Sequence, residues 1–487
     1  MYFPELFHTD LYQLTMGQSY FNTGKKDEIG TFEMFFRRLP FNGGYAVFCG
    51  RNSIYHFIEN IENSLREFVL HFGSESKFIS YFKKNFYFSE QYIQYLLKDL
   101  IHDIRSLEIN TVEEGEIIFD NTPMVQVTGK MLALQVIETP LLQIVNSQTI
   151  VATKSARIKY VAGNRLVSDF GLRRSHNPQL TYAAIVGGCD STSNIQVGAE
   201  LGVRVAGTMA HSFVMTYGTT HEAELAAFRE YARTFPENYT FLVDTYNIEK
   251  GIENAIIAAQ ERQGVGFNGI RIDSGDLCYW SVKARKMMNE AGFKKAKVVV
   301  SNNIDEYVIE SLDNQAYRDY GLKNAPIDTF GVGTRLITAY DQPALGAVYK
   351  LVEMKTPLKD YVIKVSANQE KTTIPGKKAL YRYLNCKGEF VLDFQCLCDE
   401  PVTGKQFRVI HKDFSEKTLD IDTTKGQIIP LLKPLGCTPL SEIHVQDKLK
   451  QLPLWHKRLQ FPHIYKVSLS EKLFNLRQKL IKSAVSE

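Results

Sequence analysis

The chain has 487 residues, enough for roughly two to four domains with a sizeable buried core. Its 57 Lys and Arg residues nearly balance its 54 Asp and Glu residues, and the formal charge of +3 argues against nucleic acid as the main partner. No run of about 18 apolar residues occurs, so we do not expect a membrane protein. Seven scattered cysteines suit a reducing compartment, and the opening residues lack the basic region of a signal peptide. We therefore expect a cytoplasmic protein.

Residues 1–140 mix aromatic-rich helical patterns with strand-like alternation, which predicts an N-terminal α+β domain. The helical patterns and the alternation lie at 68–72, 92–100 and 111–127. Residues 139–160 then show a long helical pattern that leads into the next domain. Pro140 suits the first turn of this helix, where proline is tolerated.

From about 165 to 350, short apolar runs recur roughly every 30 residues, with helical patterns between several of them. The runs lie at 166–170, 203–207, 241–244, 270–273, 298–301 and 329–333. This alternation is typical of βα units and a parallel sheet. Because the runs are too apolar for a half-exposed sheet, they favour a closed barrel, although an open doubly wound sheet would give the same alternation. The predicted fold class is α/β, with a (βα) barrel-like catalytic domain over 141–355.

The tail, residues 356–487, is richer in Lys, Pro and short strands and closes with a helical pattern at 470–481. We expect it to pack with the N-terminal domain, forming one α+β domain that flanks the barrel, or to form a small appended domain. The tail also contains Cys386, Cys396, Cys398 and Cys437. Their spacing includes no Cys-x2-Cys pair, so packed thiols are favoured over a zinc site.

Residues suited to phosphate and sugar follow four of the apolar runs, and the loops after barrel strands open on one face. These segments are Gly171 to Arg174, Gly207 to Ser212, Asp273 to Asp276 and Gly331 to Arg335. Glycine-bearing loops expose backbone N–H groups to phosphate oxygens, and arginine offers a planar donor fork. Carboxylates fit sugar hydroxyls or a divalent cation. The sequence therefore predicts a phosphate-and-sugar site.

Each segment taken alone has an ordinary structural explanation. Gly331-Val332-Gly333 lacks the third glycine of a dinucleotide fingerprint and could be a plain tight turn. Arg173 and Arg174 could be a solvated pair, and His211 a satisfied core histidine. Residues 273–276 could merely cap the next helix. Their shared position after the strands is the stronger observation.

Seven ordered segments carry a resemblance to a known family. They are Asp10 to Met16, Phe32 to Arg37, Glu138 to Leu142, Asp169 to Arg174, Gly207 to Ser212, Arg271 to Leu277 and Phe330 to Thr334. Together they resemble nicotinate phosphoribosyltransferase. The resemblance implies that nicotinate is joined to phosphoribosyl pyrophosphate, giving nicotinate mononucleotide and pyrophosphate, coupled to ATP hydrolysis through a phosphohistidine. It also implies Mg²⁺, a barrel flanked by a domain from both chain ends, and a homodimer with shared active sites.

The resemblance assigns roles to the matching residues. His211 would be the phosphorylated histidine. Phe170 would stack on the pyridine ring, and Tyr12 of the partner subunit would close its other side. Arg271 and Thr208 would lie at or near the nicotinate carboxylate.

The remaining roles concern the second substrate. Arg173 would lie beside the ring and the phosphates. Asp273 would face ribose hydroxyls or a hydrated magnesium ion. The 5′-phosphate would be held by Gly331, Gly333 and Thr334. The other expected site residues are Ser274, Gly275 and Asp276.

Two other functions remain open from the sequence. Nicotinamide phosphoribosyltransferase shares the Asp-Phe-Gly and Asp-Ser-Gly-Asp elements, and Asp190 could hold its carboxamide. The segments Asp10 to Met16 and Gly207 to His211 favour the acid. The non-enzyme alternative is an inactive barrel that senses a nucleotide or scaffolds a partner, and the presence of the histidine, the arginines and the carboxylates argues against it.

Overall fold

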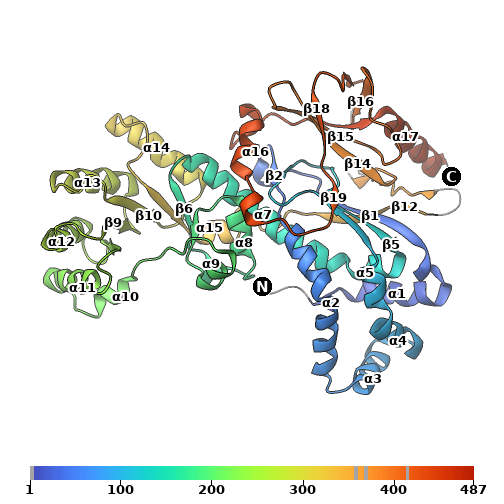
Figure 1. The fold of residues 1–487 in the computed structure, drawn as a ribbon, viewed down its shortest axis with the longest axis horizontal. Coiled ribbons are helices and arrows are strands. Elements are labelled where there is room, and N and C mark those ends of the chain that lie inside the picture. Colours follow the sequence, from blue (N-terminus) through green and yellow to red (C-terminus); the bar gives the residue numbers. More distant parts are fainter. Residues whose placement is uncertain (1–4, 356–359, 367–370, 413–415, 487) are drawn as a thin grey trace. The chain divides into compact units, whose positions relative to one another are not determined.

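The computed structural model describes residues 5–355, 360–366, 371–412 and 416–486. The chain divides into two compact units, one of residues 1–153 and 344–487 and the other of residues 154–343 (Figure 1). Helix α7 (Glu138–Ala162) runs through the boundary and confirms the helix expected at 139–160. Within the described ranges, no helix combines the length and the apolar character that a membrane crossing needs.

The unit of residues 154–343 is a parallel sheet with helices between its strands. The sheet order is β7-β6-β11-β10-β9-β8, and every pairing is parallel. The strands are β6 (Leu166–Asp169), β7 (Ser191–Thr192), β8 (Tyr239–Leu242), β9 (Phe267–Ile272), β10 (Lys297–Ser301) and β11 (Thr329–Val332). The helices are α8 (Leu180–Gly187), α9 (Ile195–Leu201), α10 (His211–Met215), α11 (His221–Thr234), α12 (Ile248–Glu261), α13 (Leu277–Glu290), α14 (Glu306–Tyr320) and α15 (Thr334–Ile337).

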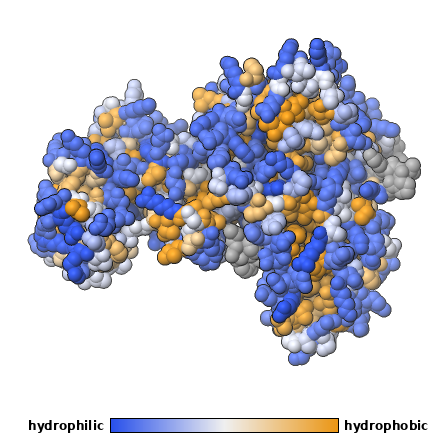
Figure 2. Space-filling view, in the orientation of Figure 1, coloured by the Kyte–Doolittle hydropathy of each residue, from blue (hydrophilic) through white to orange (hydrophobic). Residues whose placement is uncertain are grey.

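The four longer helices α11 to α14 begin in the same way. Each starts after a polar residue whose side chain accepts a hydrogen bond from a backbone N–H of the first turn, which satisfies a donor that has no partner inside the helix. These N-cap residues are Thr220, Asn247, Asp276 and Asp305. Helices α12 and α13 pack against β9, and the surface over them is mostly hydrophilic (Figures 1 and 2). Their apolar faces therefore cover the sheet.

The sheet forms a half-barrel that is open along one seam, between the edge strands β7 and β8. Because β11 pairs with β6, the strands follow chain order around the sheet from β8 through β11 to β6 and β7. Beyond β7 a single bridge joins Thr192 to Val205, and within the described residues no ladder joins Val205 to β8. The barrel-like α/β fold is confirmed, and the expectation of a closed barrel is wrong. The run at 203–207 forms only this bridge, and Val205 is accordingly 45% exposed.

The unit of residues 1–153 and 344–487 contains two six-stranded sheets. The first, β13-β12-β1-β5-β3-β19, combines strands from both chain ends, and the second, β17-β16-β20-β15-β14-β18, comes from the tail. The first sheet and the small β2-β4 sheet comprise β1 (Ile29–Phe35), β2 (Ala46–Val47), β3 (Glu108–Thr111), β4 (Ile117–Ile118), β5 (Val125–Lys130), β12 (Val348–Met354), β13 (Asp360–Tyr361) and β19 (Lys433–Pro434). The tail sheet comprises β14 (Lys378–Leu384), β15 (Phe390–Leu397), β16 (Phe407–His411), β17 (Thr418–Ile421), β18 (Gln427–Pro430) and β20 (Val467–Ser470). The expected α+β domain from both ends is confirmed.

The helices of this unit come mainly from its N-terminal part. They are α1 (Leu11–Thr23), α2 (Arg51–His71), α3 (Glu75–Phe86), α4 (Glu90–Lys98), α5 (Leu100–Arg105), α6 (Met131–Val136), α16 (Val445–Gln451) and α17 (Glu471–Ser486). A buried ion-pair network joins the tail to the N-terminal part. Arg382 of β14 donates from Nε to Asp393 of β15 at 2.8 Å and from Nη1 to Glu116 at 2.5 Å. The tail sheet is thus held to the segment just before β4.

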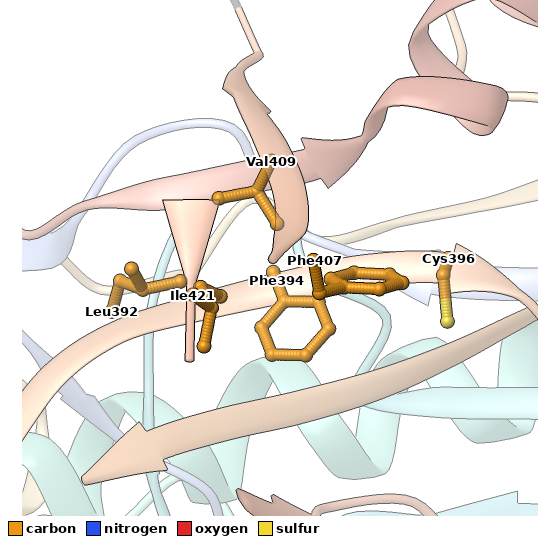
Figure 3. Packing of buried hydrophobic residues seen from close by; sticks show 6 residues of the cluster. All are labelled: Leu392, Phe394, Cys396, Phe407, Val409 and Ile421. Carbon is orange, nitrogen blue, oxygen red and sulfur yellow. The ribbon is translucent and has the colours of Figure 1, made fainter. Parts of the chain in front are cut away.

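The core of the tail sheet explains one of the four tail cysteines. Residues 392, 394 and 396 alternate along β15 and therefore point to one face of the sheet. They pack with residues of β16 and β17, and the cluster comprises Leu392, Phe394, Cys396, Phe407, Val409 and Ile421 (Figure 3). The other tail cysteines, at 386, 398 and 437, are exposed. Across the described part of the chain, no group of three or more His, Cys, Asp or Glu side chains could hold a metal ion.

Candidate active site

Polar side chains gather where β8, β9 and β10 end in the unit of residues 154–343. Parallel strands present their carboxyl ends at one edge, so the loops that follow them meet there. Hydrogen bonds and close contacts connect Thr208, His211, Asp244, Arg271, Asp273, Ser274 and Ser301. Five of the thirteen expected site residues therefore lie in this cluster: Thr208, His211, Arg271, Asp273 and Ser274.

Arg271, near the end of β9, is the central cation of this cluster. It donates from Nε to Ser301 Oγ at 3.1 Å and from Nη1 to Thr208 Oγ1 at 3.0 Å. Its Nη2 lies 3.5 Å from Asp273 Oδ2. The guanidinium carbon is 5.9 Å from the centre of the Phe170 ring, within reach of a cation–π interaction. These contacts fix the guanidinium in one orientation beside an aromatic ring.

His211 begins helix α10 and lies between hydroxyl and carboxylate groups. Its Nδ1 is 3.1 Å from Thr245 Oγ1, and its Nε2 is 3.9 Å from both Asp244 Oδ1 and Asp273 Oδ2. The side chain is 39% exposed, so the imidazole is accessible to a ligand. His211 is thus not a core histidine.

Asp244 is a site residue that the sequence analysis missed. Its side chain is fully buried, and its Oδ2 accepts hydrogen bonds from Ser274 Oγ at 2.5 Å and from the Asp273 backbone N–H at 3.1 Å. Its Oδ1 is buried and has no hydrogen-bond partner among the described residues. The available signal was position, because Asp244 ends the run at 241–244 just as Asp273 ends the run at 270–273. The carboxylates of Asp244 and Asp273 are hard oxygen ligands, so these residues fit Mg²⁺.

Phe170, directly after β6, and Gly331, in the adjacent strand β11, fit against each other. A Cβ atom built on Gly331 would lie 2.5 Å from Cε2 of the Phe170 ring, so only glycine leaves room for the ring. The turn after β6 is held by the buried Asp169, which accepts hydrogen bonds from the Gly171 backbone N–H at 2.8 Å and from Thr192 Oγ1 at 3.0 Å. Burial raises the pKa of the Asp169 carboxyl, and hydrogen bonds from neutral groups only partly offset this.

Other expected residues lie at this edge without joining the cluster through side-chain contacts. Arg173 is exposed on the short 3₁₀ helix Leu172–Arg174. Asp276 caps helix α13, its Oδ1 accepting from the Tyr279 backbone N–H at 3.0 Å, and Gly275 before it has φ 75°. Gly333 and Thr334 form the tight start of helix α15. The sequence left open that residues 273–276 cap the next helix, and Asp276 is observed to do so.

Two further residues lie elsewhere. Tyr12 belongs to the other unit, on α1, where its hydroxyl donates to Glu138 Oε1 at 3.4 Å. Asp190 lies near the amino end of β6, where it accepts a hydrogen bond from the Val167 backbone N–H at 2.7 Å and pairs with Lys159 at 2.8 Å. Asp190 therefore lies at the amino ends of the strands, whereas the cluster lies at their carboxyl ends. Its side chain is engaged in structural contacts.

The fold and the site define a class of α/β proteins with a barrel-like parallel sheet and polar groups at the carboxyl ends of its strands. A solved structure with this fold is the nicotinate-nucleotide pyrophosphorylase from Pyrococcus furiosus, at 19% identity and a TM-score of 0.64, with 91% of this chain and 95% of that chain covered. Human nicotinic acid phosphoribosyltransferase gives a TM-score of 0.78 at 28% identity, covering 97% of this chain and 99% of that chain.

Sequence comparison defines the family within this class. Models of the nicotinate phosphoribosyltransferase N-terminal domain, family and C-terminal domain match residues 7–146, 166–409 and 377–477. The nicotinate phosphoribosyltransferase of Bacillus subtilis (strain 168) is 39% identical, over 99% of this chain and 96% of that protein. The chain belongs to the nicotinate phosphoribosyltransferase family, which confirms the resemblance found in the seven segments.

Proposed function

We propose that the protein joins nicotinate to the phosphoribosyl group of phosphoribosyl pyrophosphate, and that ATP hydrolysis drives the reaction through phosphorylated His211. The observation that supports this most directly is the arrangement around Arg271. A fixed guanidinium beside the Phe170 ring suits a flat aromatic anion, and it lies in the same cluster as the accessible His211. Thr208 accepts a hydrogen bond from Arg271 and would lie near the nicotinate carboxylate.

The protein has little covalent work to do at the sugar carbon. The bond from C1 to the pyrophosphate oxygen breaks, and the pyridine nitrogen forms a new bond to C1 from the opposite face. Positioning and charge stabilisation supply the catalysis. Asp273 would face the ribose hydroxyls, Arg173 the phosphates, and Gly331, Gly333 and Thr334 the 5′-phosphate. Asp244 and Asp273 would hold Mg²⁺, which when bound would neutralise charge on the leaving pyrophosphate.

The histidine step adds a second bond change. An imidazole nitrogen attacks the γ-phosphorus of ATP, an N–P bond forms, and ADP leaves with the electron pair of the broken P–O bond. Nε2 is the nitrogen that would react, because Nδ1 contacts Thr245. Later hydrolysis of the N–P bond releases phosphate and restores the imidazole.

The proposal extends to the oligomeric state of the protein and to its cellular compartment. The protein would act as a homodimer in which Tyr12 of one subunit closes the nicotinate site of the other. All seven cysteines are free thiols, which supports a cytoplasmic location.

One experiment tests the activity. The protein is incubated with nicotinate, phosphoribosyl pyrophosphate, Mg²⁺ and ATP, and nicotinate mononucleotide and acid-labile protein phosphate are measured. We expect both to form in the wild type and the protein phosphate to vanish in His211→Ala, whereas His221→Ala, a matched exposed histidine on α11, should retain both. A wild type without product would contradict the function, and nicotinate-dependent ADP formation by His211→Ala would contradict the phosphohistidine.

A parallel assay with nicotinamide tests the closest alternative. The position of Asp190 at the amino end of β6 argues against its holding a carboxamide in the cluster. We therefore expect nicotinate to be the better substrate. A higher kcat/KM with nicotinamide would overturn that assignment.

A further inference from the structure

Two of the segments that carry the family resemblance contact each other within the unit of residues 1–153 and 344–487. They are Asp10 to Met16, at the start of α1, and Glu138 to Leu142, at the start of α7. Thr139 Oγ1 donates to Asp10 Oδ2 at 2.9 Å and accepts from the Asp10 backbone N–H at 3.4 Å. The beginning of α1 is therefore fastened to the beginning of α7.

Tyr12 makes the second connection between the two helices. Its side chain is 49% exposed, yet its hydroxyl donates to Oε1 of the buried Glu138. The other oxygen of Glu138, Oε2, accepts from Gln135 Nε2 at 2.8 Å, and Gln135 also donates to Gln13. Glu138, which accepts the hydrogen bond from Tyr12, is thus itself held in place by the buried side-chain amide of Gln135.

The hydroxyl of Tyr12 is kept as a hydrogen-bond donor. Partial burial and the negative charges of Glu138 and Asp10 raise the pKa of Tyr12 above its ordinary value. The hydroxyl donates to the carboxylate of Glu138, and this hydrogen bond limits the orientations open to the half-exposed ring.

We propose that Glu138 is a positioning residue that holds the Tyr12 ring as a preformed platform for a flat pyridine carboxylate. The inference rests on the proposed function, because that function supplies the contact between Tyr12 and nicotinate. An unanchored tyrosine would have to be immobilised when the ligand binds, which costs about three- to tenfold in affinity. The effect should thus appear in nicotinate binding rather than in the chemical step.

Tyr12→Phe in the full-length protein tests the anchor, because it removes the hydroxyl and keeps the ring. We expect KM for nicotinate to rise about three- to tenfold, with kcat and KM for phosphoribosyl pyrophosphate within about twofold of the wild type. Tyr20→Phe on the same helix is the matched control and should leave all three values unchanged. An unchanged KM for nicotinate in Tyr12→Phe would overturn the proposal.

A double-mutant cycle with Glu138→Ala separates positioning from general stability. If Glu138 acts through the Tyr12 hydroxyl, Glu138→Ala should raise KM for nicotinate, and the double variant should be no worse than the more affected single variant. Effects that multiply would overturn the proposal. If Glu138→Ala does not fold, the Tyr12→Phe result decides alone. A wild type that does not turn over nicotinate would count against the proposed function, whereas an active wild type with an unaffected Tyr12→Phe variant would count only against the anchor.

Discussion

The ring of Phe170 occupies the space that a side chain at Gly331 would need. A Cβ atom there would lie 2.5 and 2.6 Å from two ring carbons, Cε2 and Cδ2. The Phe170 ring can therefore take its position only if residue 331 of β11 is glycine. The ring in turn lies beside the guanidinium of Arg271, so the positions of the three residues depend on one another.

Gly331→Ala should displace the Phe170 ring. Because a shift of about 1 Å in a positioning group can cost on the order of 100-fold in rate, we expect kcat/KM for nicotinate to fall by about 10- to 100-fold. Steady-state kinetics checks this. Gly436→Ala is the control, since its Cβ would have only an ordinary contact at 3.6 Å. Equal kinetics in both variants would show that the ring does not need its present place.

Asp244→Asn should slow phosphorylation of His211. As the N–P bond forms, positive charge develops on the imidazole, and the nearby carboxylate of Asp244 would stabilise it. The substitution removes this negative charge and leaves the size of the side chain nearly unchanged. We expect about 10- to 100-fold less protein phosphate per unit time, measured with γ-labelled ATP. Asp420→Asn, an exposed aspartate of β17 that pairs with Arg408, is the matched control and should keep the rate within about twofold. Equal rates of phosphorylation in the two variants would contradict this role of Asp244.

Arg271→Lys should weaken nicotinate binding selectively. Lysine keeps the charge but cannot reach Ser301 and Thr208 with a rigid fork, so the cation loses its fixed orientation. We expect kcat/KM for nicotinate to fall by about 10- to 100-fold, and the ratio of nicotinate to nicotinamide activity to fall with it. Equal losses for acid and amide would mean that Arg271 does not contact the carboxylate.

Asp169→Asn should change how stability depends on pH. The pKa of Asp169 is raised in the folded state, so its contribution to stability is fully present below the unfolded pKa and is lost as pH rises through the folded pKa. The wild type should therefore lose stability relative to the variant as pH rises, because the variant has no carboxyl group to ionise at this position. Melting temperatures of both proteins at pH 4 and pH 7 measure this. A difference in melting temperature that is the same at both pH values would rule out the charge as its cause.

The positions of the site loops could be predicted from the sequence, because buried parallel strands leave long apolar runs. The runs at 270–273 and 298–301 match the ends of β9 and β10 within one residue. Strand β7 was missed because Ser191-Thr192 is only two residues long and polar. The open seam between β7 and β8 could not be predicted either, because the sequence does not show whether two edge strands pair with each other.

The side-chain contacts of the site were less accessible to sequence reasoning. Thr208, His211, Arg271, Asp273 and Ser274 were expected in one place and lie there. Asp244 and Ser301 were missed because their importance comes from contacts with residues distant in the chain. The roles of His211, Asp244 and Arg271 are predictions that the variants above test.

The open seam of the sheet has a consequence for how this fold can vary. Residues 206–238 link its two edges without a ladder, and side-chain contacts such as Arg271 with Thr208 and Tyr246 with Gly218 hold the segment instead. Insertions or deletions here need not disturb strand register in the sheet. The segment that carries His211 can therefore change in length without loss of strand pairing.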